Sequence, residues 1–259
     1  MKTYEELLEE FKAKIEEGYE TSRMDKRLIE FADESEKPVR TLWKYDHPPT
    51  PQAMHGATVI MMPTPRFRPV KPLQRGIRID LSKWDIETHM VVLDSYMYRK
   101  GSEVAEREYW AIVKGISDNA GNTVKAKKKG ELSVPDIKEA QSWIGQNARN
   151  YADTVVMPLE QKTGLLKKGK VWLPNKIPTG YVPEEDRGPY FAGMIDGARV
   201  YWMRFIKDFA LVYAKCETIM RNTPLNVYYD KPKRPSQLTI EKWCAAAPIL
   251  EQAVVKITL

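Results

Sequence analysis

The chain has 259 residues, of which 42% are hydrophobic, and 41 basic against 35 acidic residues give a net charge of +6. A chain of this length and hydrophobic content can form a core without disulfides or metals to stabilise it. Its two cysteines, Cys216 and Cys244, are too few to suggest a disulfide framework. No apolar run reaches the ~18 residues that a membrane-spanning helix requires, and the acidic N-terminus lacks the basic start of a signal peptide. We therefore expect a cytoplasmic protein, or one assembled in the cytoplasm.

The first predicted element is an amphipathic helix over residues 4–17. Glutamates surround its apolar face, which consists of Tyr4, Leu7, Leu8, Phe11 and Ile15. We expect Gly18 to end this helix. A second, short helix is predicted from Met24 to Phe31.

The most informative segment of the chain follows, between residues 38 and 80. Eight of the 18 prolines lie between Pro38 and Pro72, interleaved with apolar residues. Proline fixes φ and lacks a backbone donor, which excludes a long helix or a central strand here. The segment is also too apolar for a disordered linker.

The pattern predicts an extended arm or two-stranded loop that buries its apolar side chains on another copy of the protein. An irregular excursion packed on its own domain is the alternative. The arm residues that we expect to contact a neighbouring copy are Trp43, Tyr45, Val59, Ile60, Met61, Met62 and Phe67.

A long helix is predicted from Ser82, its expected N-cap, to Lys114. Its apolar face begins with Ile86, Met90, Leu93 and Met97. Gly101 is expected to split or bend the helix, because glycine costs ~1 kcal/mol relative to alanine in a helix interior. A helix of this length more often supports other elements than covers one small core.

The second half of the chain mixes helices and short strands. Residues 115–130 predict a loop or hairpin, and Ser133 with Pro135 opens a helix whose apolar face is Ile137, Ala140, Ile144 and Ala148. The further predicted elements are a buried strand at 154–157, a short helix at 159–168, a loop over 171–190, a turn entering a strand at 193–202, and strands at 209–213, 224–229, around Trp243 and at 253–259. Without a regular strand–helix alternation, this order predicts an α+β fold.

Patterns for enzymatic chemistry are weak. Residues 164–170 match the spacing of a phosphate-binding P-loop up to the lysine, but Val171 stands where a hydroxyl should hold magnesium, and no helix follows. His47, His55 and His89 have no metal-ligand spacing, and the chain has no Cys-x-x-Cys. We predict that the protein is not an enzyme and has no cofactor, metal or small-molecule substrate.

Three short lysine-rich clusters give the chain its basic character. They cover residues 125–129, 167–170 and 231–234, each beside glycine or proline. This context predicts solvated loop tips, with phosphate contact as the alternative.

Four stretches, in their order along the chain, resemble the HK97-fold shell proteins, which comprise tailed-virus major capsid proteins and encapsulins. Residues 75–81 lead into the helix that ends at 104–115, and this stretch is similar to the spine helix of the family. Residues 134–140 with 152–158 and 165–166 are similar to the helix, strand and short helix of the axial domain, and residues 195–201 with 205–213 are similar to its strand pair. Residues 253–257 are similar to the last strand of the peripheral domain. The resemblance covers roughly residues 66–259. The stretch 80–115 is longer than in encapsulins, which favours the viral branch, and the N-terminal helix does not clearly match the cargo-facing helix of encapsulins.

The resemblance implies a domain layout. This layout is an N-terminal helical arm (1–36), an extended loop (37–80), a peripheral domain with the spine helix (81–130), an axial domain (131–223) and return strands of the peripheral domain (224–259). In this family the extended loop reaches over the adjacent subunit, which is what an apolar, proline-rich arm requires. The N-terminal helix could face the shell interior, order the capsomer or hold an internal partner.

The function implied is that of a structural protein that self-assembles into an icosahedral shell. The favoured form is a viral major capsid protein around DNA, found in the virion and assembled in the host cytoplasm. The alternative with the same fold is an encapsulin nanocompartment in a prokaryotic cytoplasm, closed around a cargo protein. The alternative of another class is a basic nucleic-acid-binding protein. No membrane partner is expected.

Overall fold

The computed structural model describes residues 4–34, 41–44, 51–54, 57–60, 66–69, 73–81, 90–167, 187–188, 190–230 and 236–259. Its helices are α1 (Tyr4–Ser22), α2 (Asp25–Leu28), α4 (Met90–Ser117), α5 (Val134–Asn147) and α6 (Leu159–Lys167), with single 3-10 turns η3 (Lys215–Glu217) and η4 (Glu251–Ala253). Its strands are β1 (Phe31–Glu34), β2 (Thr41–Lys44), β3 (Pro51–Met54), β4 (Ala57–Ile60), β5 (Arg66–Pro69), β6 (Leu73–Leu81), β7 (Asn122–Lys125), β8 (Thr154–Pro158), β9 (Phe191–Ile195), β10 (Ala198–Met203), β11 (Phe209–Tyr213), β12 (Thr218–Asn222), β13 (Asn226–Asp230), β14 (Ser236–Pro248) and β15 (Val254–Thr258).

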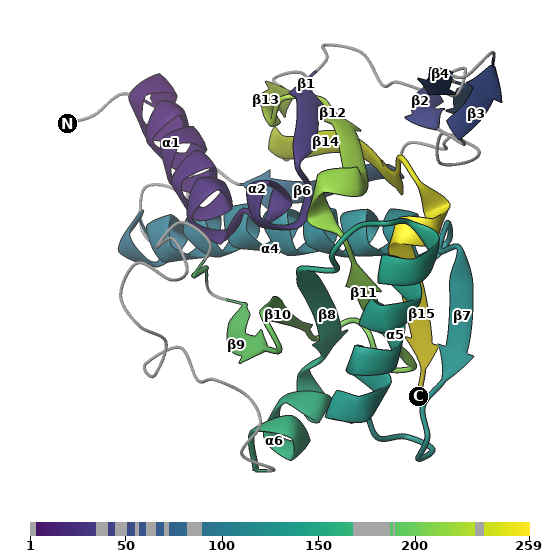
Figure 1. The fold of residues 1–259 in the computed structure, drawn as a ribbon. Helices are drawn as coiled ribbons and strands as arrows, with labels where there is room; N and C mark the ends of the chain where they lie inside the picture. Colours follow the sequence, from purple (N-terminus) through teal and green to yellow (C-terminus); the bar gives the residue numbers. More distant parts are fainter. Residues whose placement is uncertain are drawn as a thin grey trace.

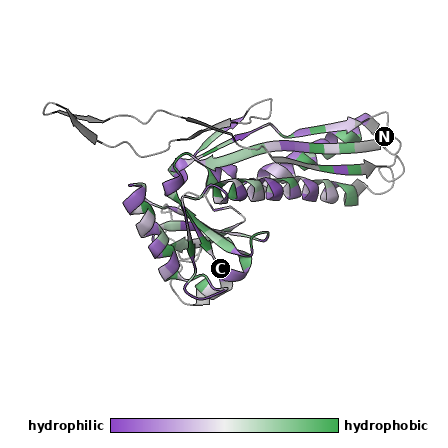
Figure 2. Cartoon of the chain, turned by 90° about the vertical axis from the view of Figure 1, so that its right-hand side faces the viewer, coloured by the Kyte–Doolittle hydropathy of each residue, from purple (hydrophilic) through white to green (hydrophobic). Residues whose placement is uncertain are grey.

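The two main sheets belong to two lobes (Figures 1 and 2). The elongated lobe contains α1, α4 and a five-stranded sheet in the order β1-β12-β14-β13, with β6 pairing β14 along its other edge. The compact lobe contains a six-stranded sheet in the order β7-β15-β11-β8-β10-β9, together with α5 and α6. The observed α+β architecture confirms the predicted fold class.

In the elongated lobe, the two long helices pack on one face of the sheet. Phe11 and Ile15 of α1, Val104 of α4 and Ile240 of β14 are fully buried together in this core. Along β14, Leu238 and Ile240 belong to the core, and alternate residues such as Thr239 and Glu241 point to the opposite face of the sheet. We call that opposite face the outer face.

The crossing of α1 and α4 corrects two predictions about glycine. Gly18 does not end the first helix, and Gly101 does not split the long one, since both helices run through these positions. A methyl group on Gly18 would overlap the backbone of Tyr98, and one on Gly101 would overlap the backbone of Ile15. Each glycine is therefore explained by the close approach of the two helices.

In the compact lobe, the sheet is covered on both faces. One face packs against α5 through a core that includes Ile137, Ile144, Val155 and Val212. The other face packs against the C-terminal half of α4 and against α2. The continuous apolar character of β8, in which every residue is buried, follows from this two-sided covering.

Several predicted elements are confirmed. Ser133 caps α5 in a reciprocal capping box with Asp136, and Pro135 lies in the first turn. The strand at β8, the short helix α6 and the strands β11, β13, β14 and β15 are present where they were expected. The long helix runs to Ser117, three residues beyond the prediction, while its expected start at Ser82 lies outside the described residues.

Other predictions were wrong in part. Residues 193–202 form most of a hairpin, β9 and β10, because Asp196 and Gly197 adopt positive φ at the turn. The helix predicted from Met24 to Phe31 is the single turn α2, and Phe31 begins β1. Residues 122–125, expected in a loop or hairpin, form β7 in parallel pairing with β15. Of the predicted loop 171–190, nearly all lies outside the described residues.

Candidate assembly surface

The arm segment contains two antiparallel strand pairs. β2 pairs with β5, which places Trp43 opposite Phe67, and β3 pairs with β4, which places Pro51 opposite Ile60 and Gln52 opposite Val59. Prolines are tolerated here because both strands of a two-stranded ribbon are edges. The two-stranded form of the arm is thus confirmed. Of the residues expected to contact a neighbour, Tyr45, Met61 and Met62 lie outside the described residues, and the contact itself stays a prediction.

The base of the arm lies beside the outer face of the five-stranded sheet. β2 is close to β12 and β14. Where β14 pairs with β12, Ala245 and Ala247 of β14 are buried in a small cluster against Ile219 of β12, on the face opposite to the main core. In Figure 1, β3 and β4 lie at one corner of the molecule, apart from both lobes. The arm therefore starts beside β12 and β14 and leads away from them.

The remainder of the outer face is exposed in part. Tyr228 of β13 is opposite Thr239 of β14, which in turn is opposite Arg78 of β6, and these three form one row across the sheet. Tyr228 is 44% exposed, and Arg78 is also exposed. Asn226 and Glu241 form the neighbouring row. This surface combines an aromatic ring with polar groups and continues the area on which the arm begins.

A buried charge pair holds the sheet to both helices. Glu108 of α4 and Lys242 of β14 are each 2% exposed, and the Nζ of Lys242 lies 3.3 Å from a carboxylate oxygen of Glu108. Tyr19 of α1 donates its hydroxyl to the other carboxylate oxygen, and the Nζ of Lys242 lies 4.7 Å from the centre of the Tyr19 ring. The amide of Asn222 lies beside the same pair.

Burial dominates the electrostatics of this pair. Burial raises the pKa of the Glu108 carboxyl above its ordinary value, and the attraction of Lys242 and the hydrogen bond from Tyr19 oppose that rise only in part. The pair therefore contributes little net stability but fixes the relative positions of α1, α4 and β14. The sequence contained a signal for it, since Glu108 occupies an apolar position of the helix pattern, but that signal does not identify the partner.

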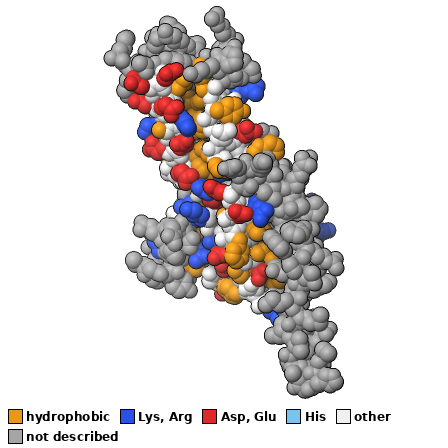
Figure 3. All heavy atoms as spheres, turned by 90° about the horizontal axis from the view of Figure 1, so that it is seen from above, with side chains coloured by type: hydrophobic (Ala, Val, Ile, Leu, Met, Phe, Trp, Pro, Cys, Tyr) orange, Lys and Arg blue, Asp and Glu red, His pale blue; other side chains and the backbone are white. Residues whose placement is uncertain are grey.

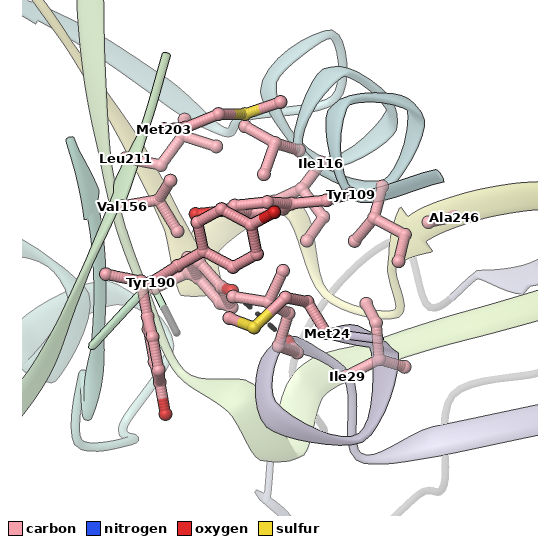
Figure 4. Packing of buried hydrophobic residues seen from close by; sticks show 14 of the residues in the cluster. Met24, Ile29, Tyr109, Ile116, Val156, Tyr190, Met203, Leu211 and Ala246 are labelled. Carbon is pink, nitrogen blue, oxygen red and sulfur yellow. Dashed lines mark hydrogen bonds between the residues drawn. The ribbon is translucent and has the colours of Figure 1, made fainter. Parts of the chain in front are cut away.

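The junction between the lobes is rich in tyrosine (Figure 4). The hydroxyl of Tyr109 on α4 donates to the carbonyl of Trp202 at 3.1 Å, and the hydroxyl of Tyr190 donates to the Glu106 carboxylate of α4 at 2.9 Å. The hydroxyl of Tyr213 on β11 donates to the carbonyl of Leu28 in α2 at 3.2 Å. Burial raises the pKa of Tyr109 and of Tyr213 well above the ordinary value, so both hydroxyls stay protonated donors.

Charge on the surface is unevenly distributed. α1 contains seven glutamates and two lysines, and Figure 3 shows acidic side chains gathered over it. In the basic cluster 125–129, Lys127 pairs with Glu139 and Lys128 pairs with Glu131. Most of 167–170 and all of 231–234 lie outside the described residues. The ion pairs within the first cluster favour its interpretation as a solvated loop.

The weak enzymatic signals do not develop into a site. Gly164 lies inside α6 rather than in a loop before a helix, so the P-loop geometry is not formed there. Within the described ranges, no three histidine, cysteine, aspartate or glutamate side chains gather as metal ligands would; all three histidines lie outside those ranges. In the same part of the chain, no helix is both long enough and apolar enough to cross a bilayer.

Comparison with solved structures identifies the fold. The virus-like particle protein of Pyrococcus furiosus is similar with a TM-score of 0.62 and 11% identity, over 96% of this chain and 98% of that chain. The capsid structure of the Cyanophage P-SCSP1u is similar with a TM-score of 0.54 and 9% identity, over 88% of this chain and 85% of that chain. The holo-SrpI encapsulin complex of Synechococcus elongatus is similar with a TM-score of 0.51 and 11% identity, over 90% of this chain and 85% of that chain. No protein-family model and no curated protein matches the sequence. The chain has the HK97-type shell-protein fold.

Proposed function

We propose that this chain is a structural shell protein, many copies of which assemble into a closed icosahedral cage. The observation that carries the proposal is the arm: two short, two-stranded ribbons attached to an HK97-type body, with β2 close to β12 and β14 and the β3–β4 ribbon apart from both lobes. An isolated two-stranded hairpin is marginally stable in water. A neighbouring copy in a cage supplies the surface that such ribbons require.

The proposed layout follows the sequence expectation. The part of the arm that precedes β6 lies, in one copy, across the outer face of the elongated lobe of the next, on the rows that contain Tyr228 and Arg78. Trp43, Tyr45, Val59, Ile60, Met61, Met62 and Phe67 supply its apolar contacts. The proposed peripheral domain, residues 81–130 and 224–259, corresponds to the elongated lobe, except that β7 and β15 belong to the sheet of the compact lobe. The proposed axial domain, residues 131–223, corresponds to the compact lobe, except that β12 belongs to the sheet of the elongated lobe. Each such contact is heterologous, and the cage closes because the rotations close.

Many weak contacts per copy are enough for a stable cage, because each contact raises the effective concentration for the others. Removing one contact type should therefore abolish assembly without unfolding the chain. The test is size-exclusion chromatography with negative-stain microscopy on three proteins: the unmodified chain, the arm variant W43A/F67A and the acceptor variant Y228A. The matched control is Y96A, since Tyr96 is 41% exposed on α4, close to the 44% of Tyr228, but lies on a helix.

We expect cages from the unmodified chain and from Y96A, and a species near the monomer mass of 29.9 kDa from the other two variants. Far-ultraviolet circular dichroism should be the same for all four. An unmodified chain that remains monomeric at high concentration would contradict the proposed function. Cages of normal yield from both W43A/F67A and Y228A would contradict the proposed path of the arm.

For the contents of the cage, we favour DNA and hence a viral capsid. The similarity to the Cyanophage P-SCSP1u capsid and the long stretch from Asp80 to Gly115 support this choice. The second candidate is an encapsulin around a cargo protein, supported by the similarity to the SrpI encapsulin complex. Particles purified from the native cell and treated with nuclease distinguish the two. Protected DNA indicates a capsid, and a second, enclosed protein indicates an encapsulin.

A further inference from the structure

The contact between the two lobes is an uninterrupted core. One cluster of buried residues includes Met24 and Ile29 of the N-terminal segment, Ile112 and Ile116 of α4, and Leu211 of the compact lobe. Figure 4 shows these elements converging on the rings of Tyr109 and Tyr190. Domains move relative to each other by default unless their interface is large and hydrophobic. The interface between these two lobes is large and hydrophobic, so we expect the lobes to hold one relative position.

Tyrosine hydroxyls add directional bonds to that core. Three of them, from Tyr109, Tyr190 and Tyr213, each join the compact lobe to α4 or α2. The rings of Tyr109 and Tyr190 also lie 5.3 Å apart in a tilted arrangement, and those of Tyr190 and Trp202 lie 5.1 Å apart edge to face. Apolar packing alone permits small sliding movements, whereas hydrogen bonds to fixed acceptors specify one arrangement.

We propose that this tyrosine-bridged junction fixes the angle between the two lobes and thereby selects one curvature, and so one diameter, for the cage. The proposal rests on the proposed shell function. In the proposed cage each copy meets its neighbours through the elongated and the compact lobe alike, so the angle between the lobes sets the angle between adjacent copies. A fixed angle closes into a cage of one size, and a variable angle closes into several.

The experiment removes the three hydroxyls and leaves the rings. The junction variant is Y109F/Y190F/Y213F. Its matched control is Y151F, because the Tyr151 hydroxyl donates to the carbonyl of Asp196 at 2.6 Å within the compact lobe and does not bridge the lobes. Both proteins and the unmodified chain are assembled identically, and particle diameters are measured by electron microscopy and particle masses by mass photometry.

We expect one diameter class for the unmodified chain and for Y151F, and a shift to several classes for the junction variant. If the junction variant is insoluble, the double variant Y109F/Y190F is measured in the same way. Cages from either junction variant that are as uniform as those of the unmodified chain would overturn this inference alone, as would unmodified cages of mixed diameter. An unmodified chain that forms no cage would overturn the proposed function and this inference with it.

Discussion

Gly18 of α1 and Gly101 of α4 bring the backbones of two helices into direct contact. A methyl group on either glycine would overlap a carbonyl oxygen of the other helix, that of Tyr98 or that of Ile15. The hydroxyl of Ser102 donates to the carbonyl of Gly18 at 3.2 Å and closes the crossing. This spacing seats α1 deeply enough for Tyr19 to reach Glu108.

Replacing Gly101 with alanine should therefore destabilise the chain. The helices must separate to accommodate the methyl group, and overpacking of this kind typically costs about 1–3 kcal/mol. Urea unfolding followed by circular dichroism measures the change. The matched control is G164A, since Gly164 is also helical but has no atoms near its missing side chain. G164A should be neutral or gain up to ~1 kcal/mol; equal losses in both variants would contradict the role of the crossing.

Replacing Lys242 with methionine should destabilise the chain strongly at neutral pH. The change keeps the aliphatic volume but leaves the buried Glu108 carboxylate without its cation. Breaking a buried pair by removing one partner costs about 3–5 kcal/mol. Thermal and urea unfolding at pH 7 measure this loss.

The K242M loss should shrink in acid. The folded-state pKa of Glu108 already lies above the ordinary 4.5, and removing the cation raises it further. A carboxyl with a raised folded pKa contributes most stability below its unfolded pKa and loses it as pH rises through the folded value. The stability of K242M should thus recover as the pH falls from 7 toward the ordinary carboxyl pKa of 4.5. The double variant K242M/E108Q reports the background from other groups, and parallel pH curves for the two variants would refute this account.

Replacing Ser133 with alanine should cost about 1 kcal/mol, because it removes the N-cap of α5. The Asp136 carboxylate accepts from the backbone N–H of Ser133 at 2.9 Å and of Lys127 at 3.1 Å, and both bonds remain available in the variant. Differential scanning calorimetry can detect the change. The control is S142A at an exposed position of the same helix, which should leave the unfolding temperature nearly unchanged.

Deleting residues 1–22 should abolish folding of the elongated lobe rather than only alter the cage. Phe11 and Ile15 are fully buried in its core, and Tyr19 is 1% exposed. Soluble expression of the deletion variant tests this. The control E9Q/E16Q changes only exposed groups of α1 and should express normally. Normal yield and particle size from the deletion variant would show that α1 is a detachable arm.

Much of the fold could be predicted from local sequence. α5 was predictable because its cap, its proline and its apolar spacing agree, and β8 because its apolar run is closed by a proline. β12 was missed because its five residues include Arg221 and Asn222, whose partners come from other elements. Gly18 was misinterpreted because a glycine that permits helix contact and one that ends a helix look the same in sequence.

Of the two parts of the proposed contact between copies, only the arm could be predicted from the sequence, and the surface that receives it could not. Prolines interleaved with apolar residues exclude a long helix or a central strand and so predict an arm, with an irregular excursion on its own domain as the alternative. The rows of the outer face around Tyr228, on which we propose that the arm of a neighbour lies, arise from the pairing of β13, β14 and β6, and β6 lies far from the other two in sequence. The bridges from Tyr109, Tyr190 and Tyr213 depend in the same way on the final packing of both lobes.

The position of β14 and β15 in the chain has a consequence for biosynthesis. β14 is the strand onto which β6, β12 and β13 all pair, and β15 lies between β7 and β11 in the other sheet. Both follow every other described strand, so neither lobe is complete on the ribosome until residues 236–258 have emerged. A nascent chain that still lacks these residues thus presents no finished surface to its siblings, and oligomerisation waits for their emergence.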